Sequence, residues 1–309
     1  MSERTGPWTA LDPRLYQIGA LSLLLAYGMA ALSFDVTPAR AALLVGAALA
    51  TQYVCTRIWR LPAFEPKSAL ISGLSLCLLL RTNDAALAVA ASALAVGSKF
   101  LLRWKGKHVF NPTNFGLAAV ILATGRAWAS PGQWGAPAFF GFLIACLGGL
   151  VVLRAARADV TFAFLGGYAG LLLARSAWLG EPLAIPLHRL QSGALLLFAF
   201  FMISDPKTTP DSRAGRVLFG LLAAFGAAFV QFRLFRSNGP IWALFALSPL
   251  TPLLDRILPG RRYDWALPKG VSDETRASVP GLLPVAVRGE PSGPPVLRVL
   301  RGPGRRETL

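Results

Sequence analysis

The chain has 309 residues, of which 54% are hydrophobic and 15% are charged, and its mean hydropathy is +0.52. Soluble globular domains carry about 25% charged residues, so this composition excludes an ordinary soluble domain and predicts an all-α integral membrane protein. The apolar segments are long and continuous, unlike the weak alternating pattern of an outer-membrane barrel.

The formal net charge is +16 and the sequence pI is about 11.0. The basic residues fall between apolar segments and in the C-terminal tail, where positive-inside topology and attraction to anionic lipid explain them. We therefore expect membrane lipid, and no nucleic acid, as a partner. The three cysteines are far apart and form no CxxC pair, so no metal site is predicted.

Ten membrane segments are predicted in chain order, at about residues 16–34, 39–59, 68–80, 85–104, 112–124, 137–153, 161–178, 192–203, 217–235 and 240–258. A straight membrane span needs roughly 20 apolar residues, so the third and eighth segments are too short to cross a bilayer alone. Short, interrupted segments usually line a site rather than face lipid, so we predict two broken helices.

Residues 15–260 are predicted to form the transmembrane domain, after a cytoplasmic N-terminus at 1–14 that has no cleavable signal pattern. Residues 261–309 are rich in Pro, Gly and Arg, which predicts a disordered cytoplasmic tail. Lysines and arginines gather in alternate loops, so both termini are predicted to be cytoplasmic.

The two short segments indicate an internal repeat. Ser72-Gly73 opens one apolar run, and Ser192-Gly193 opens the other, which stops at Asp205. The repeats would cover about 15–125 and 135–260. Five segments in each half invert the second half relative to the first, with a site near the midplane between them. The alternative is that Ser-Gly is common and membrane helices resemble one another.

Polar residues that could serve such a site lie beside the short segments. Asn111 and Asn114 flank the start of the fifth segment, where free amides could bind an anion or a polar ring edge, or Asn111 could be an ordinary N-cap. Asp205, Thr208 and Thr209 could hold a ligand, or Asp205 could end a helix in water. His108 and His188 are predicted at opposite membrane faces, which argues against a bis-His haem.

Several sequence blocks resemble the NqrB/RnfD family, the membrane subunits of the sodium-pumping NADH:quinone reductase and the Rnf electron-transport complex. The blocks are Ser68-Ala69-Leu70-Ile71-Ser72-Gly73-Leu74, Phe110-Asn111-Pro112, Phe200-Phe201-Met202-Ile203-Ser204-Asp205-Pro206 and Gly215-Arg216-Val217-Leu218-Phe219-Gly220. The resemblance implies a multi-pass protein of the bacterial inner membrane, with about ten helices in two inverted five-helix repeats similar to those of urea transporters. It also implies bound flavin and redox partner proteins.

The sequence departs from the family where such subunits commonly carry FMN esterified to threonine. The loop at 125–135 holds no threonine, and Leu195, in a block similar to the flavinylation motif, offers no hydroxyl. We therefore expect riboflavin or FMN to be bound non-covalently between the two short segments. The residues predicted to contact the flavin are Ser72, Gly73, Asn111, Asn114, Ser192, Gly193, Asp205, Thr208 and Thr209.

The leading hypothesis is thus a subunit that carries electrons from a cytoplasmic donor to an extracytoplasmic acceptor. The hydrocarbon core is roughly 30 Å thick, so one flavin ring cannot bridge it and a second centre is needed. That centre would be a second flavin, or a flavinylated or haem protein docked outside the membrane. The alternatives are a channel or transporter for a small polar solute that uses the same cleft, and a scaffold that only anchors redox partners.

Overall fold

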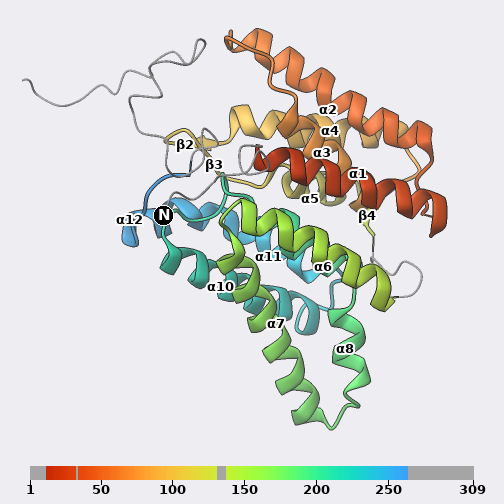
Figure 1. The fold of residues 1–309 in the computed structure, drawn as a ribbon, viewed down its shortest axis with the longest axis vertical. Helices are drawn as coiled ribbons and strands as arrows, with labels where there is room; N and C mark the ends of the chain where they lie inside the picture. Colours follow the sequence, from red (N-terminus) through yellow and green to blue (C-terminus); the bar gives the residue numbers. More distant parts are fainter. Residues whose placement is uncertain (1–11, 33, 131–136, 264–309) are drawn as a thin grey trace, which may run out of the picture. The chain divides into compact units, whose positions relative to one another are not determined.

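The computed structural model describes residues 12–32, 34–130 and 137–263 (Figure 1). The chain divides into two units, 1–266 and 267–309, and all described residues belong to the first. The expected cytoplasmic N-terminus and C-terminal tail therefore lie largely outside the described residues. The helices and strands below all belong to the first unit.

The first half of this unit holds five helices in the predicted places. They are α1 (Pro13–Ala31), α2 (Pro38–Ile58), α3 (Lys67–Leu79), α4 (Ala85–Leu101) and α5 (Pro112–Thr124). Side-chain hydrogen bonds to free backbone N–H groups define where two of these helices begin. Thr37 caps α2 by accepting from the Arg40 N–H at 3.2 Å, and Asp84 caps α4 by accepting from the Ala86 N–H at 2.8 Å.

The second half contains shorter and more broken elements. They are α6 (Pro137–Arg154), α7 (Ala158–Leu179), α8 (Ala184–Leu190), α9 (Gly193–Leu197), the π-helical turn η2 (Phe198–Met202), α10 (Arg213–Phe232), α11 (Gly239–Leu247), the 3₁₀ turn η3 (Ser248–Leu250) and α12 (Thr251–Ile257). The helix formed by α9 and η2 is bent by 47° from α8. The predicted break before the eighth segment is therefore confirmed, and the tenth segment is interrupted as well, whereas the third segment, α3, is short but unbroken.

Two short strand pairs join helix ends. β1 (Leu80–Thr82) pairs antiparallel with β4 (Ala127–Ala129), which places Arg81 opposite Trp128. β2 (Arg103–Trp104) pairs with β3 (Lys107–His108) in a tight hairpin. These strands were not predicted from the sequence, because two or three residues are too few to establish an alternating pattern.

The helices pack in corresponding sets. In the first half α2 contacts α3 and α4, and α4 contacts α5; in the second half α7 contacts α10, and α10 contacts α11. Glycines allow the backbones of neighbouring helices to come into close contact. A Cβ at Gly116 of α5 would collide with the Ala91 carbonyl oxygen of α4, and one at Gly220 of α10 would lie 2.8 Å from the Val160 carbonyl oxygen of α7.

Within the described part of the chain, α2, α7 and α10 are long and apolar enough to cross a membrane. The bent pair of α8 with α9 and η2 adds a fourth candidate span. The structure is thus that of an all-α membrane protein, as composition predicts. That ten segments cross the membrane, and that they form an inverted repeat, stay predictions.

Candidate functional site

The first helix turn of α5 meets the end of the broken helix. Asn111 caps α5, its Oδ1 accepting from the Asn114 N–H at 3.0 Å. Its Nδ2 donates to the Met202 carbonyl oxygen at 3.1 Å and, at a longer 3.5 Å, to Asp205 Oδ2. One buried asparagine therefore joins two segments that lie about 90 residues apart, one from each half of the chain.

Asp205 organises the turn after η2. Its Oδ1 accepts from the Lys207 N–H at 3.0 Å. Its carbonyl oxygen accepts from the Thr209 hydroxyl at 3.0 Å and the Thr208 hydroxyl at 3.3 Å. Burial raises the pKa of the Asp205 carboxyl, although the hydrogen bond from Lys207 and the charges of Lys207 and Lys99 act in the opposite direction.

Asn114 lies in the first turn of α5, three residues after Asn111, and is fully buried. Its Nδ2 donates to the Ile241 carbonyl oxygen of α11 at 3.2 Å. Its Oδ1 is buried and has no hydrogen-bond partner among the described residues. A buried polar atom without a partner is costly, so Asn114 Oδ1 is an acceptor available to a ligand. We call Asn111, Asn114, Asp205, Thr208 and Thr209 the asparagine–aspartate cluster.

The other predicted contacts lie elsewhere. Ser72 bonds within its own helix, donating to the Ser68 carbonyl oxygen at 3.0 Å, and a Cβ at Gly73 would lie 3.0 Å from Val45 Cα, so Gly73 serves helix packing. Ser192 and Gly193 stand at the start of α9. About ten residues of helix, roughly 15 Å, separate them from Asp205, so they are not part of the cluster.

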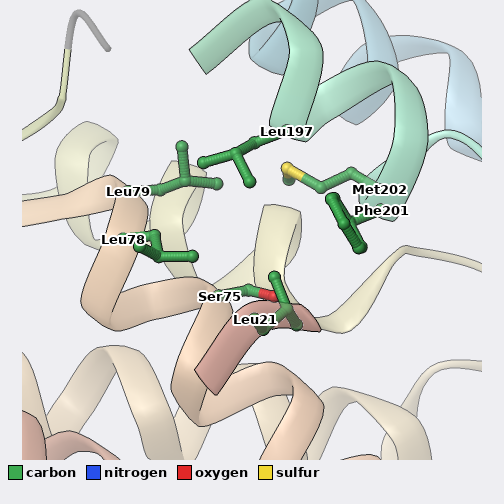
Figure 2. Close-up of a pocket in the computed structure, with 7 residues that line it drawn as sticks. All are labelled: Leu21, Ser75, Leu78, Leu79, Leu197, Phe201 and Met202. Carbon is green, nitrogen blue, oxygen red and sulfur yellow. The ribbon is translucent and has the colours of Figure 1, made fainter. Parts of the chain in front are cut away.

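The two short segments do face each other, as predicted. Leu78 and Leu79 of α3 point toward Leu197 of α9 and Met202 of η2 (Figure 2). The gap between them leaves no room for a water molecule, and Ser75 is the one polar residue among the seven that line it. The space between the two short segments, where the sequence predicts the flavin, is therefore closed and apolar, because leucines from both segments fill it.

Two buried lysines were not predicted as site residues. Lys99 of α4 is 4% exposed, and its Nζ donates to Ser68 Oγ at 3.1 Å; within the described residues no carboxylate lies within 4.0 Å of it. Lys107 bridges Asp211 at 2.9 Å and Asp255 at 2.7 Å. For Lys99 the sequence offered a signal, because a lysine inside an apolar helix of a membrane protein is a candidate functional residue.

The fold and the cluster together define a class of protein: an all-α membrane protein with a broken helix and a buried polar contact between its two halves. Residues 124–264 match the model of the NQR2, RnfD, RnfE family. The resemblance inferred from the sequence is thereby confirmed for this part of the chain. The matched region contains Asp205, Thr208 and Thr209 but not Asn111 or Asn114.

Similar curated proteins are named as subunits of an ion-translocating oxidoreductase complex. The D subunit of the ion-translocating oxidoreductase complex of Escherichia coli O1:K1 is 34% identical over 139 residues, which cover 44% of this chain and 35% of that protein. The protein of the same name from Shigella boydii serotype 18 is 34% identical over 120 residues, covering 38% of this chain and 34% of that protein. The chain thus spans about a third of the length of these relatives.

Proposed function

We propose that this chain is a membrane subunit of an ion-translocating oxidoreductase complex in the bacterial inner membrane, and that it transfers electrons across that membrane. The family match over residues 124–264 and the names of the similar proteins support the class of complex. The apolar helices support a place within the bilayer. The other subunits of the complex are then its partners.

In this proposal, riboflavin or FMN binds non-covalently at the asparagine–aspartate cluster. The observation that carries it is the buried Asn114 Oδ1, for which the described part of the chain provides no hydrogen-bond partner. The pyrimidine edge of an isoalloxazine ring offers one N–H donor and several acceptors, and the cluster offers this acceptor together with amide and hydroxyl groups. The leucine interface of Figure 2 does not fit such a ring, so we assign the ring's polar edge to the cluster instead.

The protein's own residues would then position the ring and set the charge around it. The flavin supplies the one- and two-electron chemistry. Asn111 fixes the distance between α5 and the Asp205 turn, while Lys99 and Lys207 place positive charge near that turn. Burial raises the pKa of the Asp205 carboxyl, whose Oδ1 and Oδ2 accept hydrogen bonds from the Lys207 N–H and from Asn111 Nδ2.

One ring at this cluster cannot carry electrons across a core roughly 30 Å thick. We therefore propose a second redox centre, on an extracytoplasmic flavinylated or haem protein docked to this chain or as a second flavin within it. A polar-solute channel is less well supported, because the interface between the two short segments is lined by apolar side chains apart from Ser75.

The full chain, purified in mild detergent, tests the proposal by its visible spectrum and by the fluorescence of the supernatant after acid precipitation. We expect released flavin from the wild type and at least a tenfold lower occupancy in Asn114→Leu, because one buried hydrogen bond is lost and the site is filled. Fluorescence that stays with the denatured protein in a gel would instead indicate covalent flavin.

Asn238→Gly is the matched control. Asn238 precedes α11 as Asn111 precedes α5, and its Nδ2 donates to the Ala129 carbonyl oxygen outside the cluster. Its φ of 57° is one that glycine adopts readily, so this variant should fold and keep its flavin. A colourless wild-type protein that still assembles with its partner subunits would support the scaffold hypothesis and refute flavin binding at the cluster.

A further inference from the structure

A polar cavity lies at the ends of α2, α3 and α4, away from the asparagine–aspartate cluster. Its volume is about 140 Å³. The cavity is formed where α2 and α4 begin and α3 gives way to β1, and β4 closes one side through Trp128. Its lining includes Asp35, Thr37, Arg40, Arg81, Asn83 and Trp128.

Two arginines from different elements line this cavity. Arg81 of β1 is 6% exposed, and its Nη1 donates to the Leu80 carbonyl oxygen at 2.9 Å and the Cys77 carbonyl oxygen at 3.1 Å. Those bonds fix the guanidinium against the end of α3. Neither Arg81 nor Arg40 forms a salt bridge within 4.0 Å with any described carboxylate, although Asp35 lines the same cavity.

Arg40 supplies a second observation. Its Nη1 is buried and has no hydrogen-bond partner among the described residues, and its Nη2 reaches the Asn83 carbonyl oxygen only at 3.4 Å. A buried guanidinium N–H without an acceptor is expensive, and an anion in the cavity would satisfy it. The first turn of α2, capped by Thr37, adds the positive end of a helix dipole at the same place.

The size and charge of the cavity limit what it can hold. Pockets for drug-sized ligands measure about 300–1,000 Å³, so this one is too small for an isoalloxazine ring but large enough for a small anion. Two guanidinium groups match a tetrahedral, doubly charged oxyanion, with which arginine forms paired hydrogen bonds. Asp35 is an exposed residue that also lines the cavity, and its negative charge would repel a bound anion.

We propose that this cavity binds a phosphate group between Arg40 and Arg81. The group is either inorganic phosphate or the phosphodiester of a lipid headgroup, since both present at least two negatively charged, non-bridging phosphoryl oxygens to the arginines. The proposal does not depend on flavin binding, because it uses none of the residues of the asparagine–aspartate cluster.

Thermal unfolding of the purified full chain in detergent tests this, with inorganic phosphate titrated at constant ionic strength against acetate. We expect a saturable rise in Tm with phosphate, which acetate does not reproduce. Arg40→Gln should raise the half-saturating phosphate concentration at least tenfold, since one charge-assisted hydrogen bond is lost. Asp35→Asn should lower it, because a repulsive charge is removed.

Arg126→Gln is the matched control, because Arg126 is an exposed arginine near the same helix ends that pairs with Asp84 at 2.9 Å outside the cavity. Phospholipid phosphorus per protein is measured on the same preparations. No phosphate effect, but co-purified phospholipid that Arg40→Gln alone loses, would identify a lipid headgroup as the source. An equal response of Arg40→Gln and Arg126→Gln, or neither phosphate stabilisation nor retained lipid, would overturn the proposal.

Discussion

Lys107, Asp211 and Asp255 form a buried ion network that ties three distant parts of the chain together. The lysine follows the β2–β3 turn, Asp211 precedes α10, and Asp255 lies in α12. The side chains are only 10%, 14% and 19% exposed, and Asp255 also accepts from the Asp211 N–H at 2.7 Å. Because these charges are largely removed from water, taking away one member leaves its partners buried without a counter-ion, which is costly.

We therefore predict that Lys107→Met lowers the free energy of unfolding by about 3–5 kcal/mol, because it leaves two buried carboxylates without their cation. Urea unfolding in detergent, followed by tryptophan fluorescence, measures this. Arg126→Gln breaks a pair whose arginine is 70% exposed and should cost less than about 1 kcal/mol. Equal losses in the two variants would show that burial does not govern the strength of these pairs.

His108 should make stability depend on pH. Burial lowers its pKa from 6.5 to about 3, and the charges of Arg103, Lys99 and Lys207 act in the same direction. The folded protein therefore keeps His108 neutral, whereas the unfolded chain binds a proton below pH 6.5. The stability that is present above pH 6.5 is then lost as the pH falls from 6.5 toward 3, at up to about 1.4 kcal/mol per pH unit.

The measurement is thermal or urea unfolding between pH 7.5 and 4.5. His108→Gln removes the titrating ring, so the stability difference between the variant and the wild type should change across this range in the variant's favour at low pH. Parallel curves for the two proteins would mean that His108 is not held neutral by the fold. Comparing the two proteins cancels the contribution of the other titrating groups.

At the scale of elements, helix placement followed from the sequence because an apolar run and its polar stop are local signals. The fifth segment illustrates this: both the prediction and the structure place it at 112–124, between the Asn111 cap and Gly125. The leucine contacts between α3 and α9 were not predictable, because which leucines meet depends on how the helices of the two halves are rotated relative to each other. The same is true of the Lys107 network.

Close contact between α4 and α5 depends on Gly116. A Cβ there would collide with the Ala91 carbonyl oxygen and lie 2.7 Å from Ala95 Cβ, so the two helices would have to separate. We predict that Gly116→Ala costs about 1–3 kcal/mol, as other overpacking substitutions do. Gly97→Ala in α4 has open space at its Cβ and should be neutral or stabilising, by helix propensity. The urea unfolding midpoints of the two variants, each compared with the wild type, test this prediction. Equal midpoints would contradict it.

For the molecule as a whole, the helix contacts support the predicted repeat without establishing it. The α1–α3 contact has a counterpart in α6 with α9 and η2, and α2–α4 has one in α7–α10. The pairs α1–α6 and α5–α11 join elements in equivalent positions of the two halves. Such self-pairing is expected around a pseudo-twofold axis. The sequence indicated this through the two Ser-Gly starts, whereas the contact of Asn111 with Met202 required the assembled halves.

The predicted repeat requires α5 to carry the chain across the membrane. This helix has 13 residues, about 20 Å, which is less than the roughly 30 Å of the hydrocarbon core. The β2–β3 hairpin before it and β4 after it must therefore complete the passage if the loops on either side face opposite compartments. Lys105 in the hairpin is exposed, and Arg126 beyond α5 is exposed as well.

We predict that a single cysteine at these two positions reports opposite sides of the membrane. In a chain with Cys55, Cys77 and Cys146 replaced by alanine, a membrane-impermeant maleimide should label Arg126→Cys in intact spheroplasts and Lys105→Cys only after permeabilisation. The bias of lysine and arginine toward the Lys105 side sets this direction. Labelling of both positions from the same side would mean that α5 does not carry the chain across, so the two halves could not each contain five crossings. The inverted repeat would then have to be abandoned, while the asparagine–aspartate cluster would remain as a contact between α5 and the broken helix.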